Sequence, residues 1–243
     1  MPERMLSANG VELNVWTEGA GPPVVLAHGF PELGYSWRHQ VSVIADAGYT
    51  VIAPDQRGYG RSSRPPDVES YDIHHLCGDL LSILDNLGHD KAVFVGHDWG
   101  SMIVWHLALL RPERVAGVVG MSVPFMPRSP VPPISAMKAI FGDSFFYILY
   151  FETPGLADED LGRDPARTMR GFLAGPLRAD SGGVGTDRDA AAGFVARLPP
   201  ADDHRGTVIV DGAGHWVQQE RPGEVKSALL DFLAGLERDG RTW

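Results

Sequence analysis

The pentapeptide Gly96-His97-Asp98-Trp99-Gly100 joins a short apolar strand pattern, Ala92–Val95, directly to a helical pattern, Met102–Leu110. A strand-to-helix turn this tight brings the two backbones together and leaves little room for side chains at its glycines. Its central residue is lifted above the end of the strand, where the dipole of the following helix stabilises a carboxylate. The pattern predicts that Asp98 is presented as a nucleophile, although capping of the helix is a second interpretation of an aspartate at this position.

Strand and helix patterns alternate on both sides of this turn, after an N-terminal hairpin centred on Asn9-Gly10. Short links between alternating elements are typical of a parallel sheet that is covered by helices on both faces. The expected strands are Met5–Ala8, Val11–Trp16, Val24–Ala27, Thr50–Ala53, Ala92–Val95 and Val115–Val123, and the expected helices are Trp37–Ala47, Asp72–Leu87 and Met102–Leu110.

The alternation stops at Pro124–Pro133, a stretch rich in proline that favours a boundary. A helix is expected over Ser135–Phe151, and the segment from 158 to 203 has few large apolar residues. A strand at Thr207–Val210 and a helix at Glu224–Leu236 then complete the pattern. We therefore expect residues 1–123 and 186–243 to form one domain and residues 124–185 to be inserted into it.

Composition excludes several classes of protein. The chain has 21 Lys and Arg against 31 Asp and Glu, so its net charge of -10 argues against binding of nucleic acid. The single cysteine, Cys77, excludes an internal disulfide and a cysteine-based zinc cluster. No apolar stretch is long enough to span a membrane, and the N-terminus has no apolar signal core, so we expect a soluble, cytoplasmic protein. No motif for a cofactor or metal is present, and none is expected.

Two further motifs follow strand patterns. His28-Gly29-Phe30-Pro31 comes after Val24–Ala27, where a backbone N–H can be aimed at the end of the sheet, and Gly212-Ala213-Gly214-His215-Trp216 comes after Thr207–Val210. Neither motif by itself is strong evidence for a catalytic site. The first is ordinarily a turn, and a histidine like the one in the second is ordinarily structural. An oxyanion turn, then a nucleophile, then a late histidine is the order found in α/β-hydrolases.

The chain resembles the epoxide hydrolases of the α/β-hydrolase superfamily, the soluble type with an aspartate nucleophile. The resemblance is carried by His28–Glu32, Tyr35–Gln40, Asp55–Gly60, Gly96–Gly100 and Gly214–Trp216, and it extends to the aromatic segment Phe146–Phe151. It implies an α/β-hydrolase fold, with a mostly parallel central sheet, helices on both faces and a truncated helical cap inserted after the sixth strand.

The resemblance also implies a two-step reaction. Asp98 attacks a small hydrophobic epoxide to form an ester while Tyr147 protonates the opening oxygen, and His215 then activates a water that hydrolyses the ester. The N–H groups of Phe30 and Trp99 hold the oxyanion. A detoxification role follows from this chemistry, and the residues expected to contact substrate are His28, Pro31, Trp37, Tyr150 and Trp216.

This sequence departs from the family pattern in its tyrosines and in its length, and it offers two candidates for the orienting acid. The family uses a second cap tyrosine, but no tyrosine follows Tyr150. The acid that orients the histidine is expected at Asp187, with Asp189 as the alternative and two solvated loop acids as the ordinary interpretation. The chain is also several dozen residues shorter than the family pattern, which predicts a shortened cap, a missing sheet strand and weak turnover.

Two other functions stay open at this point. A haloalkane dehalogenase would share Asp98, Trp99 and His215, because displacement of a halide also proceeds through an ester. A non-catalytic binding protein of the same fold would keep an open apolar pocket. Tyr147 favours the epoxide hydrolase, since a phenol can protonate an epoxide oxygen. A homodimer is one of the assemblies left open.

Overall fold

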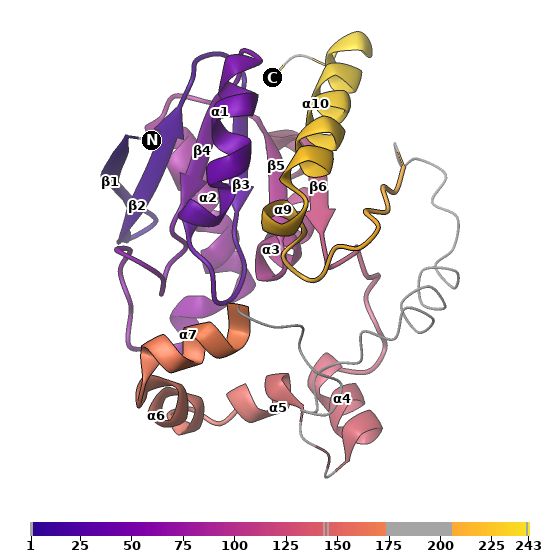
Figure 1. Ribbon diagram of the computed structural model, residues 1–243. Coiled ribbons are helices and arrows are strands. Elements are labelled where there is room, and N and C mark those ends of the chain that lie inside the picture. The colour runs from indigo at the N-terminus through magenta and orange to yellow at the C-terminus, as the bar shows by residue number, and fades with distance from the viewer. Residues whose placement is uncertain (1, 143, 145, 174–205, 242) are drawn as a thin grey trace. The chain divides into compact units, whose positions relative to one another are not determined.

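The computed structural model describes residues 2–142, 144, 146–173, 206–241 and 243 (Figure 1). The chain divides into two compact units. The first, the core unit, contains Met1–Phe125 and Arg205–Trp243, and the second, the helical unit, contains Met126–His204. The role of the helical unit as a cap stays a prediction from the sequence.

The core unit is built on a six-stranded sheet with the order β1-β2-β4-β3-β5-β6. β1 and β2 form the expected hairpin, β2 pairs antiparallel with β4, and the remaining neighbours are parallel. The mostly parallel α/β architecture expected from the alternating patterns is therefore confirmed. The strands are β1 (Glu3–Ala8), β2 (Val11–Glu18), β3 (Pro23–Ala27), β4 (Thr50–Pro54), β5 (Ala92–His97) and β6 (Val115–Met121).

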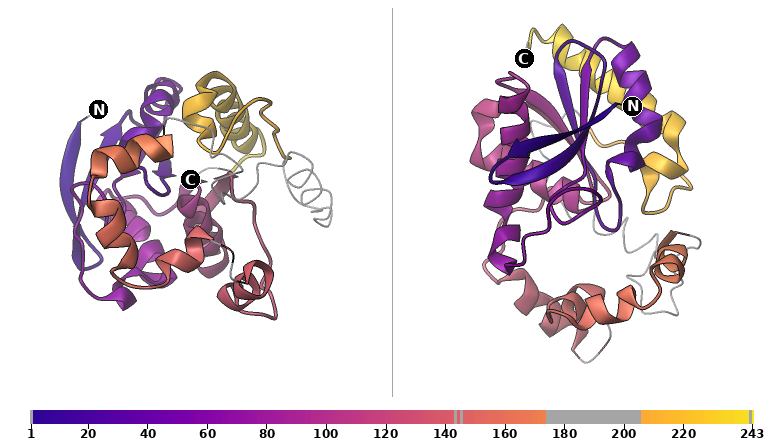
Figure 2. Two further views of the ribbon diagram at one scale, coloured as in Figure 1. Left: turned by 60° about the horizontal axis from the view of Figure 1, so that its bottom comes forward. Right: turned by 90° about the vertical axis from the view of Figure 1, so that its left-hand side faces the viewer.

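Helices cover both faces of this sheet. On one face, α1 (Arg38–Asp46) and α10 (Pro222–Arg238) pack around the fully buried Trp37. On the other face, α2 (Ile73–Asn86) and α3 (Trp99–Leu110) pack on Phe94. The right-hand view of Figure 2 shows the twisted sheet with α10, in yellow, on one side of it. Shorter turns of helix complete the unit at η1 (Gly34–Trp37), η2 (Val68–Tyr71), η3 (Pro112–Arg114) and α9 (Val217–Glu220).

The predicted strand Thr207–Val210 is wrong, because the structure assigns these residues to no strand. Val208 is 67% exposed and Ile209 is 79% exposed. Within the described residues the sheet ends at β6, so this segment has no ladder of backbone hydrogen bonds. Its β-branched residues favour a strand locally, but a strand forms only where a neighbour pairs with its backbone.

In the helical unit, the single helix predicted over Ser135–Phe151 is also wrong. It is divided into α4 (Pro133–Phe141) and α5 (Tyr147–Phe151), and Gly142, with φ of 53°, ends the first of them. The aromatic rings of Phe141 and Phe146 stack across the break with centroids 4.0 Å apart. Two helices that the sequence did not predict follow at α6 (Leu156–Gly162) and α7 (Pro165–Leu173).

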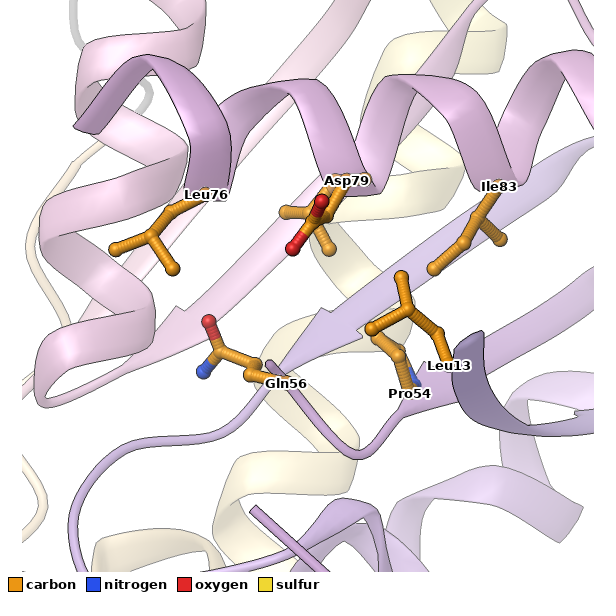
Figure 3. Close-up of a pocket in the computed structure, with 7 residues that line it drawn as sticks. Leu13, Pro54, Gln56, Leu76, Asp79 and Ile83 are labelled. Atoms are coloured by element: carbon orange, nitrogen blue, oxygen red, sulfur yellow. The ribbon is translucent and has the colours of Figure 1, made fainter. Parts of the chain in front are cut away.

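A buried ion pair joins α2 to the loop after β4. Arg57 donates from Nε to Asp79 Oδ2 at 2.7 Å and from Nη2 to Asp79 Oδ1 at 2.5 Å, and both side chains are at most 5% exposed. Beside it, between α2 and the sheet, lies a cavity of about 10 Å³. Figure 3 shows the side chains that line it, which are Asp79, Gln56 and apolar residues. This volume holds about one water molecule, so the cavity is too small for an organic substrate.

We expect Asp79→Ala to lower the free energy of unfolding by about 3–5 kcal/mol, because it leaves the Arg57 guanidinium buried without its partner. Urea denaturation measures this loss. The matched control is the double variant Arg57→Met with Asp79→Leu, which removes both charges and should regain most of the loss. A double variant less stable than Asp79→Ala would contradict the explanation that the loss comes from the unpaired charge of Arg57.

Candidate active site

Asp98 lies at the turn between β5 and α3 with φ of 53° and ψ of -118°, a backbone conformation that is strained for a side-chain-bearing residue. A Cβ added at Gly96 would lie 2.3 Å from the carbonyl oxygen of Gly100, and one added at Gly100 would lie 2.1 Å from that of Ala27. Glycine is therefore required at both positions, because any side chain would collide with the neighbouring backbone. Asp98 is the N-cap residue of α3, as the second interpretation expected, but its side chain makes no capping hydrogen bond, so side-chain capping does not explain the aspartate.

The carboxylate of Asp98 is surrounded by donors. Its Oδ1 accepts the N–H of Phe30 at 2.9 Å, and its Oδ2 lies 3.4 Å from Nε2 of His215. Burial acts to raise the pKa of Asp98, but hydrogen bonds from the His215 side chain and from the N–H groups of Phe30 and Trp99 outweigh it and hold the pKa below its usual range. The structure thus places Asp98, His215, Phe30 and Trp99 together, as the sequence predicted.

His215 belongs to a loop that is held mainly through its backbone. The His215 carbonyl accepts hydrogen bonds from Nε2 of His97 and from Oγ of Ser122, each at 2.7 Å. Next to it, the N–H groups of Gly214 and Trp216 donate to the Glu220 carboxylate at 2.6 and 3.1 Å. These contacts fix the backbone at and on either side of His215, and the described residues directly before this loop, 206–210, form no strand.

Beneath this loop lies a buried polar group that includes Glu32 and His97. Nδ1 of His97 is 2.8 Å from Oε2 of Glu32, and both side chains are at most 3% exposed. The amides of Gln218 and Gln219, which flank the loop, also donate to Glu32. The two ring nitrogens of His97 thus lie against the Glu32 carboxylate on one side and the His215 carbonyl on the other.

Sequence reasoning gave neither Glu32 nor His97 a role. Both lie inside motifs that it had singled out, Glu32 directly after the Phe30-Pro31 turn and His97 directly before Asp98. The signal that could have revealed this pair is His97 itself, an ionisable residue inside a buried strand. Such a side chain needs a polar partner.

Two of the predicted substrate contacts are corrected by the structure. His28 is fully buried, with Nδ1 2.9 Å from the carbonyl of Gly29 and Nε2 accepting the N–H of Gln56 at 3.0 Å. Burial lowers the pKa of His28, which favours the neutral ring. Trp37 is also fully buried, in the apolar layer between the sheet and its helices. Both side chains pack the core instead of facing a substrate.

The other predicted substrate contacts in the core unit, Pro31 and Trp216, are partly exposed. The Trp216 ring packs edge-on against the His215 ring with centroids 5.2 Å apart. Their contact with substrate stays a prediction.

In the helical unit, Tyr147 begins α5 and is 36% exposed, with its ring packed edge-on against Phe146 and Phe151. The hydroxyl of Tyr150 donates to Oδ2 of Asp160 at 3.0 Å. The roles predicted for both tyrosines stay predictions.

The orienting acid expected at Asp187 or Asp189 lies outside the described residues. Among the residues that are described, no group of three or more His, Cys, Asp or Glu side chains is arranged to hold a metal ion. No helix in that part of the chain is long and apolar enough to cross a membrane.

Comparison with known proteins agrees with this geometry. Residues 22–180 match the model of the alpha/beta hydrolase fold family. Epoxide hydrolase A of Mycobacterium tuberculosis (strain ATCC 25618 / H37Rv) is 43% identical in an alignment that covers 97% of this chain and 98% of that protein. The chain belongs to the epoxide hydrolases of the α/β-hydrolase superfamily. Family membership also makes it a hydrolase.

Solved structures of the family support the assignment. The crystal structure of epoxide hydrolase A from Mycobacterium thermoresistibile is 40% identical, with a TM-score of 0.81 over 96% of this chain and 98% of that one. An epoxide hydrolase from an endophytic Streptomyces is 31% identical, also with a TM-score of 0.81, over 98% and 96% of the two chains.

The alignment with the Mycobacterium tuberculosis relative also bears on the length of this chain. It extends over 315 positions, although the chain has 243 residues. Because both proteins are covered almost from end to end, part of the relative has no counterpart inside this chain. This finding agrees with the shortening that the sequence predicted.

We expect the carboxyl carbon of Asp98, followed by NMR as the pH falls, to titrate below the ordinary aspartate value of about 3.9. Its pKa is lowered by donors that favour the charged form, so the carboxylate stays ionised while ordinary aspartates become protonated. His215→Gln removes the imidazole donor and should move the midpoint upward. A midpoint above the ordinary value in the unsubstituted protein would contradict this description of the site.

Proposed function

We propose that this protein hydrolyses epoxides to vicinal diols through an ester formed on Asp98. The observation that carries the proposal is the Asp98 carboxylate itself, held at a strained turn within hydrogen-bond distance of a backbone N–H and close to an imidazole. A carboxylate can displace an oxygen at a saturated carbon, and the ester that results can still be hydrolysed. A serine in this position would form a stable ether.

In the first step, Oδ2 of Asp98 forms a bond to an epoxide carbon and the bond from that carbon to the ring oxygen breaks. The hydroxyl of Tyr147 gives its proton to the departing oxygen. Oδ1 keeps its hydrogen bond to Phe30, so the attacking oxygen is the one that faces His215. Because Tyr147 is the one cap tyrosine to which the resemblance assigns proton donation, we expect ring opening to be slower than in a relative with two such donors.

In the second step, Nε2 of His215 takes a proton from a water molecule, whose oxygen attacks the carboxyl carbon of Asp98. Negative charge develops on Oδ1, where the N–H groups of Phe30 and Trp99 stabilise it. The tetrahedral species collapses, the diol leaves with the former Oδ2, and the proton on His215 passes to the diol oxygen. The water's second proton, left on the Asp98 carboxyl group, is released to solvent, and the Tyr147 phenolate takes up a proton from solvent, so both groups return to their starting states. The sequence predicts Asp187 as the acid that orients His215, with Asp189 as the alternative.

The substrate class is a small hydrophobic epoxide, with water as the second reactant. The cytoplasmic location and the role in detoxification are further predictions from the sequence, which leaves a homodimer open as one of the possible assemblies.

Diol formation from styrene oxide and halide release from a bromoalkane, measured side by side, test this function. We expect diol without halide, and Asp98→Ala should abolish diol formation because the first bond cannot form. Halide release without diol would replace the proposal with a haloalkane dehalogenase. Binding of the epoxide without either product would indicate a binding protein.

We expect His215→Gln to open one equivalent of epoxide and then stop, because its ester cannot be hydrolysed. Rapid quenching and mass spectrometry of the peptide that contains Asp98 measure the burst. The control is His39→Gln, which alters a histidine of α1 that takes no part in the proposed reaction. A His215→Gln variant that shows no burst would contradict the division of the reaction into these two steps.

A further inference from the structure

The end of β6 contacts both halves of the proposed site. The carbonyl of Met121, the last residue of the strand, accepts the N–H of Asp98 at 3.1 Å. The next residue, Ser122, donates from Oγ to the carbonyl of His215 at 2.7 Å. Figure 1 shows β5, which leads to Asp98, lying beside β6. Two successive residues therefore connect the backbone of the nucleophile to the backbone of the histidine.

Ser122 also has an unusual backbone conformation, with φ of 63°. Among the described residues, the other non-glycine residues with positive φ are Asn9 and Asp98. Asn9 forms the hairpin turn between β1 and β2, and Asp98 forms the turn that presents the nucleophile. A serine is strained in this conformation, which persists only where surrounding contacts enforce it, and such residues gather at functional sites.

The hydrogen bond from Ser122 is especially important for the loop that carries His215. The segment before it, Thr207–Val210, is not a strand, so no ladder of backbone hydrogen bonds from those residues positions the histidine. Its carbonyl is held from the buried side by His97 and from the exposed side by Ser122. Loss of either donor would allow the imidazole to move relative to Oδ2 of Asp98, which lies 3.4 Å away.

We propose that Ser122 is a positioning residue for His215: its hydroxyl, presented by a left-handed backbone at the end of β6, holds the imidazole in place for hydrolysis of the ester. This inference rests on the proposed function. Because His215 acts in the second step, Ser122 influences that step and has no part in ring opening.

The decisive variant is Ser122→Gly, which removes the hydroxyl while suiting the positive φ. Ser122→Asn is the conservative variant, because asparagine tolerates the left-handed conformation and its amide can donate a hydrogen bond. The matched control is Asn9→Gly, which removes a polar side chain at the other strained turn that lies away from Asp98 and His215.

Quenched-flow kinetics separate the two steps. We expect Ser122→Gly to change ester formation by less than about twofold and to slow ester hydrolysis by about three- to tenfold, the range for one lost hydrogen bond. Ester should accumulate, and Ser122→Asn should restore much of the rate. Asn9→Gly should lower the melting temperature without changing either rate. Equal loss in both steps, or no loss in ester hydrolysis, would overturn the proposal.

A second measurement is independent of turnover. The NMR signal of the His215 ring, assigned by its loss in His215→Gln, should shift or broaden in Ser122→Gly and stay unchanged in Asn9→Gly. A His215 signal unaffected by Ser122→Gly would overturn the proposal even if the unsubstituted protein formed no ester. Absence of ester in the unsubstituted protein would instead contradict the proposed function, so the two failures are distinguishable.

Discussion

The contact between Asp98 and His215 depends on how closely three backbone segments approach one another. The turn after β5 has no room for side chains at Gly96 and Gly100, and this crowding holds Asp98 in a strained conformation. The turn after β3 then brings the N–H of Phe30 to the Asp98 carboxylate. Since β3, β5 and β6 are adjacent and parallel, their ends meet at one edge of the sheet, and the site is assembled there.

The same donors serve two purposes in this arrangement. In the resting protein, the N–H groups near Asp98 and the His215 side chain stabilise the charged carboxylate and lower its pKa. During hydrolysis of the proposed ester, those N–H groups would face the oxyanion that forms on the same carbon. Because the groups are already oriented, little reorganisation accompanies the reaction. The hydrogen bonds to the His215 carbonyl also hold the proposed base in position before the reaction.

Features with local causes could be predicted from the sequence. The hairpin at Asn9-Gly10, the turn at Asp98 and the alternation of strands and helices follow from residue types within a few positions, and the resemblance to the family supplied the roles of Phe30, Trp99 and His215. Features that depend on distant partners could not be predicted in this way. Thr207–Val210 has a strand composition but pairs with no strand among the described residues, and the contacts of Glu32, His97 and Ser122 join residues far apart in the chain.

A single turnover in oxygen-18 water, with protein in excess over epoxide, tests the central claim most directly. Water is expected to attack the carboxyl carbon of Asp98, so the account predicts label in the peptide that contains Asp98 and an unlabelled diol. Label in the diol, with none in that peptide, would show that water attacks the epoxide itself and would contradict the ester mechanism.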